Sequence, residues 1–311
     1  MKVFVAGANG AIGKQLVPPL VAAGYQVTAI SRSQRHVEKL RALGAEPVIA
    51  DALDRAAVMR AVCEAQPEVI IHELTALTGV KDYKNFDREF ALTNRLRTEG
   101  TDHLLAAARA VGVRRFIAQS YGNWNYARTG GMVKAEDDAL DPMPPANQRE
   151  SLAAIRHLEG AVVGAQGMEG IALRYGMLYG PGTSYDSDGD VAAMVRKRMF
   201  PVIGDGAGVW SFIHVVDAAG ATIAAIGQGV PGVYNIADDE PAPVRDWLPV
   251  YAQALGARPP MHFPVWVGKL MVGDVGVSLM TRIRGASNAK ARRELAWTPT
   301  YASWRHGFKF A

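Results

Sequence analysis

The sequence predicts an α/β protein with a doubly wound parallel sheet, covered by helices on both faces, and a smaller C-terminal lobe. Two patterns indicate this fold class. Short runs rich in β-branched and aromatic residues alternate with helical stretches over the first half of the chain, which is typical of parallel sheets with right-handed crossovers. A glycine-rich turn also joins the first predicted strand to the first predicted helix.

Six strands are expected before the pattern loosens near residue 179. They cover residues 2–7, 26–31, 46–51, 68–74, 114–120 and 170–176. Helical periodicity is clearest over residues 104–113 and 151–163. The longest apolar stretch, residues 263–280, contains Lys269, Asp274 and three glycines. Because a membrane span is normally longer and free of charge, we expect one or two packed helices there.

Composition and charge narrow the class of protein. Hydrophobic residues make up 49% of the chain and charged residues 21%, as in a globular protein. The 34 basic and 30 acidic residues give a slight, dispersed net charge of +4, so no nucleic-acid partner is expected. Cys63 is the only cysteine, no histidines have metal-ligand spacing, and no signal-peptide pattern precedes the first strand. We expect a cytoplasmic protein without a metal site or a membrane partner.

Three glycines, Gly7, Gly10 and Gly13, lie between the first predicted strand and its helix. Gly7 allows a tight turn, Gly10 allows backbone to approach a pyrophosphate, and Gly13 allows the helix to pack closely on the strand. Free N–H groups at the positive end of that helix bind phosphate well. The motif therefore predicts a dinucleotide site formed by Gly7, Asn9, Gly10, Ala11, Ile12 and Gly13.

The GxxGxxG spacing resembles that of the short-chain dehydrogenase/reductase superfamily, in its extended or atypical, epimerase/dehydratase-like branch. The segments "VIIHELTA", "RRFIAQS" and "LRYGMLYGPG" resemble the regions of the family's fourth, fifth and sixth strands, and "FIHVVDAA" and "NAKARRELAWTP" resemble its late segments. The resemblance spans nearly the whole chain in the correct order. It implies a nicotinamide dinucleotide cofactor with further contacts from Asp51, Ala52, Leu74, Thr75, Gln119, Tyr175, Gly176 and Met177.

Two parts of the chain are expected on this basis. Residues 1–178 are expected to form a Rossmann-type NAD(P)-binding domain, and residues 179–311 a smaller substrate-binding lobe. The lobe is expected to be interleaved with the main sheet, and the segment "SFIHVVDAA", residues 211–219, is expected to pack back on the first domain.

The end of the second predicted strand bears on the choice of dinucleotide. Enzymes that use NAD usually place an acidic residue there to hold the ribose 2′-hydroxyl. This chain has Ser31, Arg32, Ser33 and Arg35 instead, and hydroxyls and guanidinium groups suit a 2′-phosphate. The sequence favours NADP(H), with Ser31 and Arg32 as contacts, and leaves NAD(H) as the alternative.

The catalytic pair of the resembled family has no counterpart in the helix predicted over residues 151–163. The family uses a Tyr as proton donor or acceptor and a Lys four residues later, which lowers the pKa of the Tyr. When Glu159 is aligned with the acid that usually follows the Lys, Ser151 takes the Tyr position and Ile155 the Lys position. The usual mechanism therefore cannot be carried over.

The end of the fifth predicted strand offers replacements. Ser120 and Tyr121 stand where the family has a residue that hydrogen-bonds the substrate oxygen, and side chains at the carboxyl end of such a strand face the ligand crevice. Tyr121 is the candidate proton donor and Ser120 the candidate orienting residue, with positive charge from Lys134 or Arg156. The alternative is that Tyr121 only packs against its loop and Ser120 only caps the strand.

Three functions remain open from the sequence. The first is an NADP(H)-dependent oxidoreductase that reduces a small organic carbonyl or activated alkene. The second is a redox-neutral epimerase or dehydratase of a nucleotide sugar, and the third is a non-catalytic protein that senses NADP(H). A small-molecule substrate and a homodimer are the expected partners.

Overall fold

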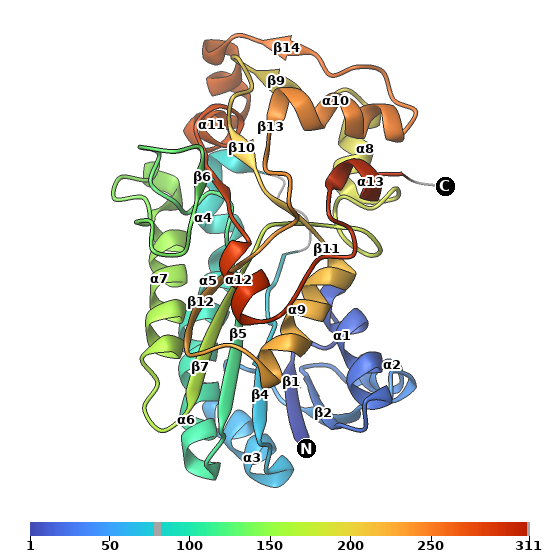
Figure 1. Ribbon diagram of the computed structural model, residues 1–311, viewed down its shortest axis with the longest axis vertical. Helices are drawn as coiled ribbons and strands as arrows, with labels where there is room; N and C mark the ends of the chain where they lie inside the picture. The colour runs from blue at the N-terminus through green and yellow to red at the C-terminus, as the bar shows by residue number, and fades with distance from the viewer. Residues whose placement is uncertain (78–81, 310–311) are drawn as a thin grey trace.

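Seven parallel strands form the central sheet of the protein (Figure 1). The computed structural model describes residues 1–77 and 82–309. All six predicted strands are present, and a seventh joins them, so the predicted α/β fold class is confirmed. In the order of the sheet the strands are β12 (Gly232–Ile236), β7 (Glu169–Tyr175), β5 (Arg115–Tyr121), β4 (Val69–His72), β1 (Lys2–Ala6), β2 (Gln26–Ser31) and β3 (Glu46–Ile49).

Helices cover both faces of this sheet (Figure 1). One face packs against α1 (Ala11–Ala22), α2 (Val37–Ala42), α9 (Val215–Gly227) and α12 (Ala289–Glu294). The other face packs against α3 (Arg55–Ala65), α6 (Thr101–Val111) and α7 (Arg149–Val163). Side chains of adjacent strand residues point to opposite faces, so an apolar strand such as "KVFVA" supplies both cores: Val3 and Val5 to one, Phe4 and Ala6 to the other.

The order of the strands reverses between β1 and β4. From β1 the chain continues through β2 to β3 on one side, and then returns to place β4 against the other side of β1. In an open α/β sheet, ligands bind at the carboxyl ends of the strands beside such a reversal. Gly7 follows β1 and Glu73 follows β4, so the topology places both residues at this point.

A second, aromatic core lies beyond the carboxyl ends of the strands (upper part of Figure 1). At its centre Trp210, Phe212 and Trp247 pack with ring centroids 5.1–6.2 Å apart. The elements around it are α8 (Asp190–Arg196), β9 (Val202–Ile203), β10 (Val209–Trp210), β11 (Phe212–His214), β13 (Ala242–Pro243), α10 (Val244–Ala254), β14 (His262–Phe263), α11 (Val265–Thr281) and α13 (Trp304–Gly307).

Short elements complete the described chain. They are η1 (Gln34–His36), η2 (Tyr83–Asn85), α4 (Phe86–Glu89), α5 (Ala91–Arg95), the π-helical turn η3 (Leu96–Gly100), β6 (Val133–Lys134), η4 (Ala146–Gln148), β8 (Met177–Tyr179) and β15 (Gly285–Ala286). The seventh sheet strand, β12, and helix α9 come from beyond residue 178 yet belong to the main sheet and its helical layer. The division of the chain at residues 178 and 179 stays a prediction.

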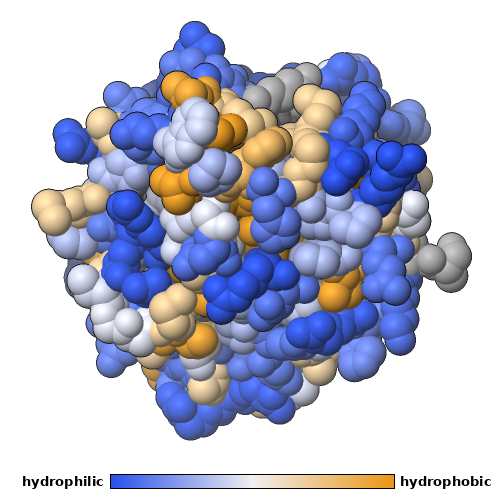
Figure 2. Space-filling model, turned by 90° about the horizontal axis from the view of Figure 1, so that it is seen from above, coloured by the Kyte–Doolittle hydropathy of each residue, from blue (hydrophilic) through white to orange (hydrophobic). Residues whose placement is uncertain are grey.

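Helix α11 contains the longest apolar stretch of the sequence. Gly273 breaks its regular backbone with φ of 69° and ψ of −173°, so the stretch forms two packed helical pieces, as the sequence allowed. Its first piece exposes Trp266 and Leu270, each 68% accessible, at the end of the molecule that Figure 2 views from above, where hydrophobic side chains are scattered among hydrophilic ones. Within the described ranges, no helix has the length and apolar character needed to cross a membrane.

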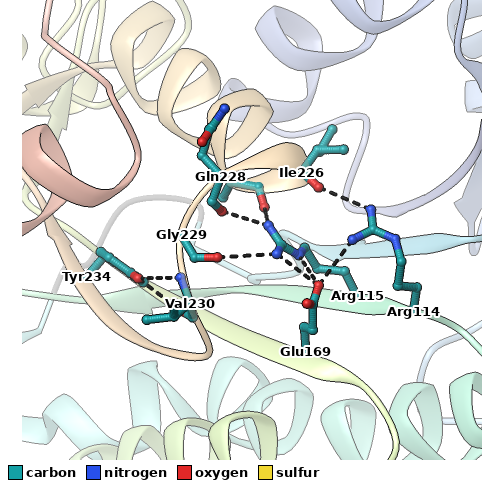
Figure 3. A network of polar contacts seen from close by, with 9 residues as sticks. Arg114, Arg115, Glu169, Ile226, Gln228, Gly229, Val230 and Tyr234 are labelled. Carbon is teal, nitrogen blue, oxygen red and sulfur yellow. Dashed lines mark hydrogen bonds and ion pairs between the residues drawn. The ribbon is translucent and has the colours of Figure 1, made fainter.

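Arg115, at the amino end of β5, anchors α9 and the turn that leads to β12 (Figure 3). Its guanidinium donates to the carbonyl oxygens of Ala225 and Gln228 at 2.7 and 2.6 Å and to Glu169 at 2.8 Å. A helix ends with carbonyl groups that lack partners inside the helix, and a cation satisfies them well. Arg115 therefore fixes the end of α9 against the sheet.

Arg115→Met should lower the melting temperature by about 3–5 °C, because it leaves the carbonyls of Ala225 and Gln228 without this donor and Glu169 with Arg114 alone, at a cost of about 2–3 kcal/mol. Thermal unfolding followed by circular dichroism measures the change. Arg114→Met is the matched control, since its half-exposed side chain shares Glu169, and we expect a drop of less than half that size. Equal drops for both variants would contradict the anchoring role of Arg115.

Candidate functional site

A cavity of about 650 Å³ lies at the carboxyl ends of the sheet strands, within the size range of ligand pockets. Every residue that the sequence assigned to the cofactor lines it; whether they contact a cofactor stays a prediction. These residues are Gly7, Asn9, Gly10, Ala11, Ile12, Gly13, Ser31, Arg32, Asp51, Ala52, Leu74, Thr75, Gln119, Tyr175, Gly176 and Met177.

The glycine turn has the geometry of a phosphate cradle. Gly7 has a φ of +108°, and a Cβ atom there would lie 2.6 Å from the backbone of Glu73. A Cβ atom on Gly13 would lie 2.5 Å from Cα of Ala8, so α1 packs on the turn with no space for a side chain. At Gly10, in contrast, the single close atom is the Gly7 carbonyl oxygen at 3.3 Å. No side chain caps the amino end of α1, which leaves its first amides for a ligand.

Basic residues gather around one end of the cavity, after β2. Arg32 lines the cavity and is exposed, and His36, which the sequence analysis did not assign, lines it as well. Burial and then the charges of Arg35, Lys39, Arg32 and Lys14 lower the pKa of His36. Arg35 itself donates to His36 at 3.2 Å and does not line the cavity. This end is therefore electropositive, and Asp51 is the carboxylate in its wall.

A chain of buried hydroxyls begins at Glu73, another lining residue that the sequence analysis did not assign. The Glu73 carboxyl lies 2.9 Å from the hydroxyl of Tyr175, which lies 2.6 Å from Thr222, whose hydroxyl donates to the carbonyl of Ala218. Burial raises the pKa of Glu73 to about 8, although the hydrogen bonds to Tyr175 and Thr222 oppose the shift. A protonated Glu73 can donate to Tyr175, Tyr175 can donate to Thr222, and Thr222 donates to Ala218. Each hydroxyl in this series then accepts one hydrogen bond and donates one.

Tyr121 and Ser120 lie on opposite sides of β5. Tyr121 lines the cavity, whereas Ser120 is 1% accessible and donates to Glu159 of α7 at 2.6 Å. The expectation that both side chains face the ligand is therefore corrected, because adjacent strand residues point to opposite faces. Burial raises the pKa of Tyr121 far above its usual value of 10, and the hydrogen bond with Asn123 and the charge of Arg97 offset this only in part. Tyr121 therefore holds its proton at neutral pH.

The α7 positions aligned with the family's Tyr and Lys are buried and engaged elsewhere. The Ser151 hydroxyl donates to Asp87 at 2.6 Å, and Ile155 belongs to the aromatic core. Four residues later, Glu159 accepts two hydrogen bonds from Arg174, at 2.7 and 2.6 Å. At the two positions that the sequence alignment assigns to the pair, helix α7 thus carries a serine bonded to Asp87 and a buried isoleucine.

The positive charge beside Tyr121 comes from Arg97 and not from the two residues predicted to supply it. Lys134 forms an ion pair with Asp138 at 3.0 Å, and Arg156 donates to the carbonyl of Asp141 at 2.8 Å. Neither residue lines the cavity, whereas Arg97 does. The predictions for Lys134 and Arg156 are therefore wrong: Lys134 at the end of β6 and Arg156 on α7 both bond to residues outside the cavity wall.

Helical periodicity could have found Arg97. The buried residues Thr93, Gly100, Thr101 and Leu104 lie four before, and three, four and seven after it. Residues at these spacings share one helical face. A charged residue on the buried face of a predicted helix is unusual and marks a candidate functional residue.

Known proteins resemble this chain both in sequence and in fold. The model of the NAD-dependent epimerase/dehydratase family matches residues 3–237, which include the glycine cradle and the whole central sheet. The chain belongs to this family. The resemblance seen in the sequence is thereby confirmed, and the chain is a nicotinamide-dinucleotide-dependent enzyme of the short-chain dehydrogenase/reductase type.

Proteins similar to this chain include reductases and an epimerase. A 3-diazoavenalumate denitrifying reductase from a Streptomyces species is 45% identical over 99% of both chains. A 2-alkyl-3-oxoalkanoate reductase from Stenotrophomonas maltophilia is 27% identical over 83% of this chain and 76% of its own. The solved structure of UDP-glucose 4-epimerase with UDP-glucose from Thermotoga maritima has a TM-score of 0.76 and 25% identity, over 99% of this chain and 96% of its own.

Glu73→Gln should stabilise the protein increasingly as the pH rises. The folded-state pKa of Glu73, about 8, exceeds its unfolded value of about 4.5, so the stability that its neutral form contributes is complete below pH 4.5 and is lost as the pH approaches 8. A glutamine stays neutral: its amide can donate to Tyr175, and its carbonyl can accept from Gln119, whose amide nitrogen comes within 3.3 Å of residue 73 when the Gln119 amide is turned over.

Thermal unfolding of both proteins at pH 5 and pH 8 tests this expectation. We expect the melting temperature of the variant to exceed that of the wild type by about 2 °C or more at pH 8 and by less at pH 5. Exposed Glu64 of α3 gives the control, Glu64→Gln, whose difference should not depend on pH. A difference for Glu73→Gln that is constant or shrinks with rising pH would show that Glu73 is ionised in the folded protein.

Proposed function

We propose that this chain is an NADP(H)-dependent reductase of a small unsaturated organic compound, namely a carbonyl, an activated alkene or a diazo compound. One observation carries the proposal. A single cavity joins the glycine cradle at one end to a protonated phenol, Tyr121, beside a cation, Arg97, at the other. The 45% identity to a reductase over nearly the full length of both chains supports the same reaction class.

The residues around the cradle fit a dinucleotide. Gly7, Gly10 and Gly13 leave backbone amides and no side chains where a diphosphate would lie. At the other end, the backbone of Tyr175, Gly176 and Met177 forms the cavity wall beside Tyr121, which pairs with Tyr175 across β5 and β7. When bound, a reduced nicotinamide supplies a hydride to the substrate.

Tyr121 provides the proton in this proposal. Its hydroxyl is neutral at working pH, and the Asn123 side chain hydrogen-bonds it while the Arg97 charge favours its ionised form. The phenol can therefore hydrogen-bond a substrate oxygen, give up its proton as negative charge develops there, and be stabilised as a phenolate by its neighbours. Arg97 thus supplies the charge that the family's Lys normally provides.

The same cavity argues against redox-neutral chemistry. Epimerisation of a nucleotide sugar begins with removal of a proton from a sugar hydroxyl, which requires a base at the substrate end. Among the described lining residues, Asp51 and Glu73 carry the carboxyls; Asp51 lies after β3, at the end near Arg32, and burial keeps Glu73 protonated below about pH 8. Tyr121 keeps its own proton. The epimerase alternative is supported by the family itself, by 28% identity to a UDP-glucose 4-epimerase over 97% of this chain and by 25% identity to an epimerase solved with UDP-glucose.

Tyr121→Phe should reduce turnover by a factor of about 100 or more, because a positioned proton donor contributes on that order. The assay is NADPH oxidation with a panel of ketones, enones and aryl diazo compounds, continued with the compound that the wild type turns over fastest. The Kd for NADPH should stay within about twofold of wild type, which shows that the site is intact. Unchanged turnover would exclude Tyr121 as the donor, and a wild type that binds NADPH but reduces nothing would favour the sensing protein.

Arg32 is the proposed contact to the 2′-phosphate of NADP(H). It is exposed at the cavity wall in a cluster of basic residues that includes Lys14, Arg35 and Lys39. A guanidinium pairs with a phosphate through two parallel hydrogen bonds, and no acidic residue at the end of β2 competes for the ribose 2′-hydroxyl.

Arg32→Ala should raise the Kd for NADPH about tenfold or more and leave the Kd for NADH within about twofold, because only NADPH carries the phosphate. Fluorescence titration of the purified protein gives both constants. Arg35→Ala, next to the cavity but not in its wall, is the control and should change NADPH binding less. Equal weakening of both cofactors by Arg32→Ala would refute the phosphate contact.

A further inference from the structure

Arg97 is a buried cation whose Nε and Nη1 atoms lack a hydrogen-bonding partner in the part of the chain that the structure describes. Its side chain lies in the cavity wall, and the residue is 3% accessible. An unpaired buried charge is strongly unfavourable for a folded protein. A protein retains such a group where a bound ligand supplies the opposite charge. Arg97 therefore indicates a site for an anionic ligand.

Neighbouring carboxyl groups do not neutralise Arg97. Glu159 is near enough for its charge to act on Arg97, but both of its oxygens accept from Arg174 and one also accepts from Ser120. Glu73, in the same cavity, is protonated at neutral pH. The substrate end of the cavity therefore keeps a net positive charge.

The backbone on both sides of Arg97 is fixed. His72, at the end of β4, lies 3.3 Å from the carbonyl oxygen of Leu96 and 3.1 Å from the hydroxyl of Thr101 through its Nε2 atom. Its Nδ1 atom accepts from the amide of Leu74, so Nε2 carries the proton and donates. Burial lowers the pKa of His72 to about 4, and it therefore stays neutral. The guanidinium is held by a rigid framework, as expected of a binding group.

The surroundings of Arg97 in the cavity are apolar and aromatic. Leu92, Leu96 and Met177 line this part together with the rings of Tyr121 and Tyr185. Such walls suit a flat, unsaturated body, while a planar guanidinium binds a carboxylate through two parallel hydrogen bonds.

We propose that Arg97 binds the carboxylate of the substrate, and that the substrates of this enzyme are aromatic or conjugated carboxylates. This inference rests on the proposed reductase function. It explains why the protein keeps a cation in an apolar wall, since the carboxylate supplies the missing negative charge. The alternative occupant is an anionic part of the cofactor, which the experiment below distinguishes.

The test uses the full-length protein saturated with NADP⁺ and isothermal titration with cinnamate, benzoate and phenylacetate, each against its neutral primary amide. We expect at least one carboxylate to bind the wild type about tenfold or more tightly than its amide, because Arg97 contacts the charged group. In Arg97→Met the preference should fall to about twofold or less. Arg95→Met is the matched control, since Arg95 pairs with Glu99 on the exposed side of the same helical segment, and it should behave as the wild type.

Two further measurements complete the test. The Kd for NADP⁺ should stay within about threefold in Arg97→Met, and its melting temperature without ligand should equal or exceed that of the wild type, because an unpaired buried charge is removed. Arg97→Lys keeps the charge and should keep part of the preference. A preference that persists in Arg97→Met, a wild type that binds no carboxylate up to 10 mM, or a loss of NADP⁺ affinity as large as the loss of carboxylate affinity overturns the proposal.

Binding without turnover separates this inference from the proposed function. If the carboxylates bind through Arg97 but NADPH is not oxidised with any compound of the panel, the reductase proposal fails and the carboxylate site stands. If NADPH is oxidised with neutral ketones or enones while no carboxylate binds, the reductase proposal stands and the carboxylate site fails.

Discussion

The close approach of backbone to backbone at the first turn of the chain is the constraint on which the rest of the site depends. Gly13 brings α1 against Ala8, and Gly7 brings the end of β1 against Glu73. A Cβ atom at Gly7 would push the end of β1 away from the residue that follows β4, and a Cβ atom at Gly13 would push α1 away from the turn. Because β1 and β4 are adjacent at the reversal of strand order, these two contacts position the cradle, Glu73 and the turn that follows β4.

Burial and solvation then divide the charged groups around the cavity into four kinds. Arg174 and Glu159 neutralise one another inside the protein, and Glu73 avoids a charge by keeping its proton. The Nε and Nη1 atoms of Arg97 have no partner among the described residues, and the basic residues after β2 are solvated at the other end. In a region of low dielectric, one uncompensated charge dominates the local potential. The electrostatic potential at the substrate end therefore depends on Arg97. The charge of Arg97 also offsets part of the rise that burial causes in the pKa of Tyr121.

The cofactor cleft could be predicted from sequence because its determinants are local. A glycine triplet between a strand and a helix, or a residue at the end of a strand, has its position set by a few neighbours in the chain. Ser120 could not be placed from the sequence. The end of β5 is where the sequence predicts it, but only the orientation of the strand in the sheet decides that Gln119 and Tyr121 face the cavity while Ser120 faces Glu159. Lys134 does not supply positive charge to the cavity, because it pairs with Asp138, four residues after it in the chain.

By itself the sequence determined the fold class, the sheet strands, the glycine cradle and the lack of Tyr and Lys within residues 149–163, which form α7. Those features depend on residue type and short-range periodicity. Only the tertiary structure decided which charge stands beside Tyr121. Arg97 and Tyr121 are 24 positions apart in sequence, and they meet because α5, η3 and α7 pack over the carboxyl ends of β4 and β5. Contacts between segments distant in sequence are set by packing, which no local pattern encodes.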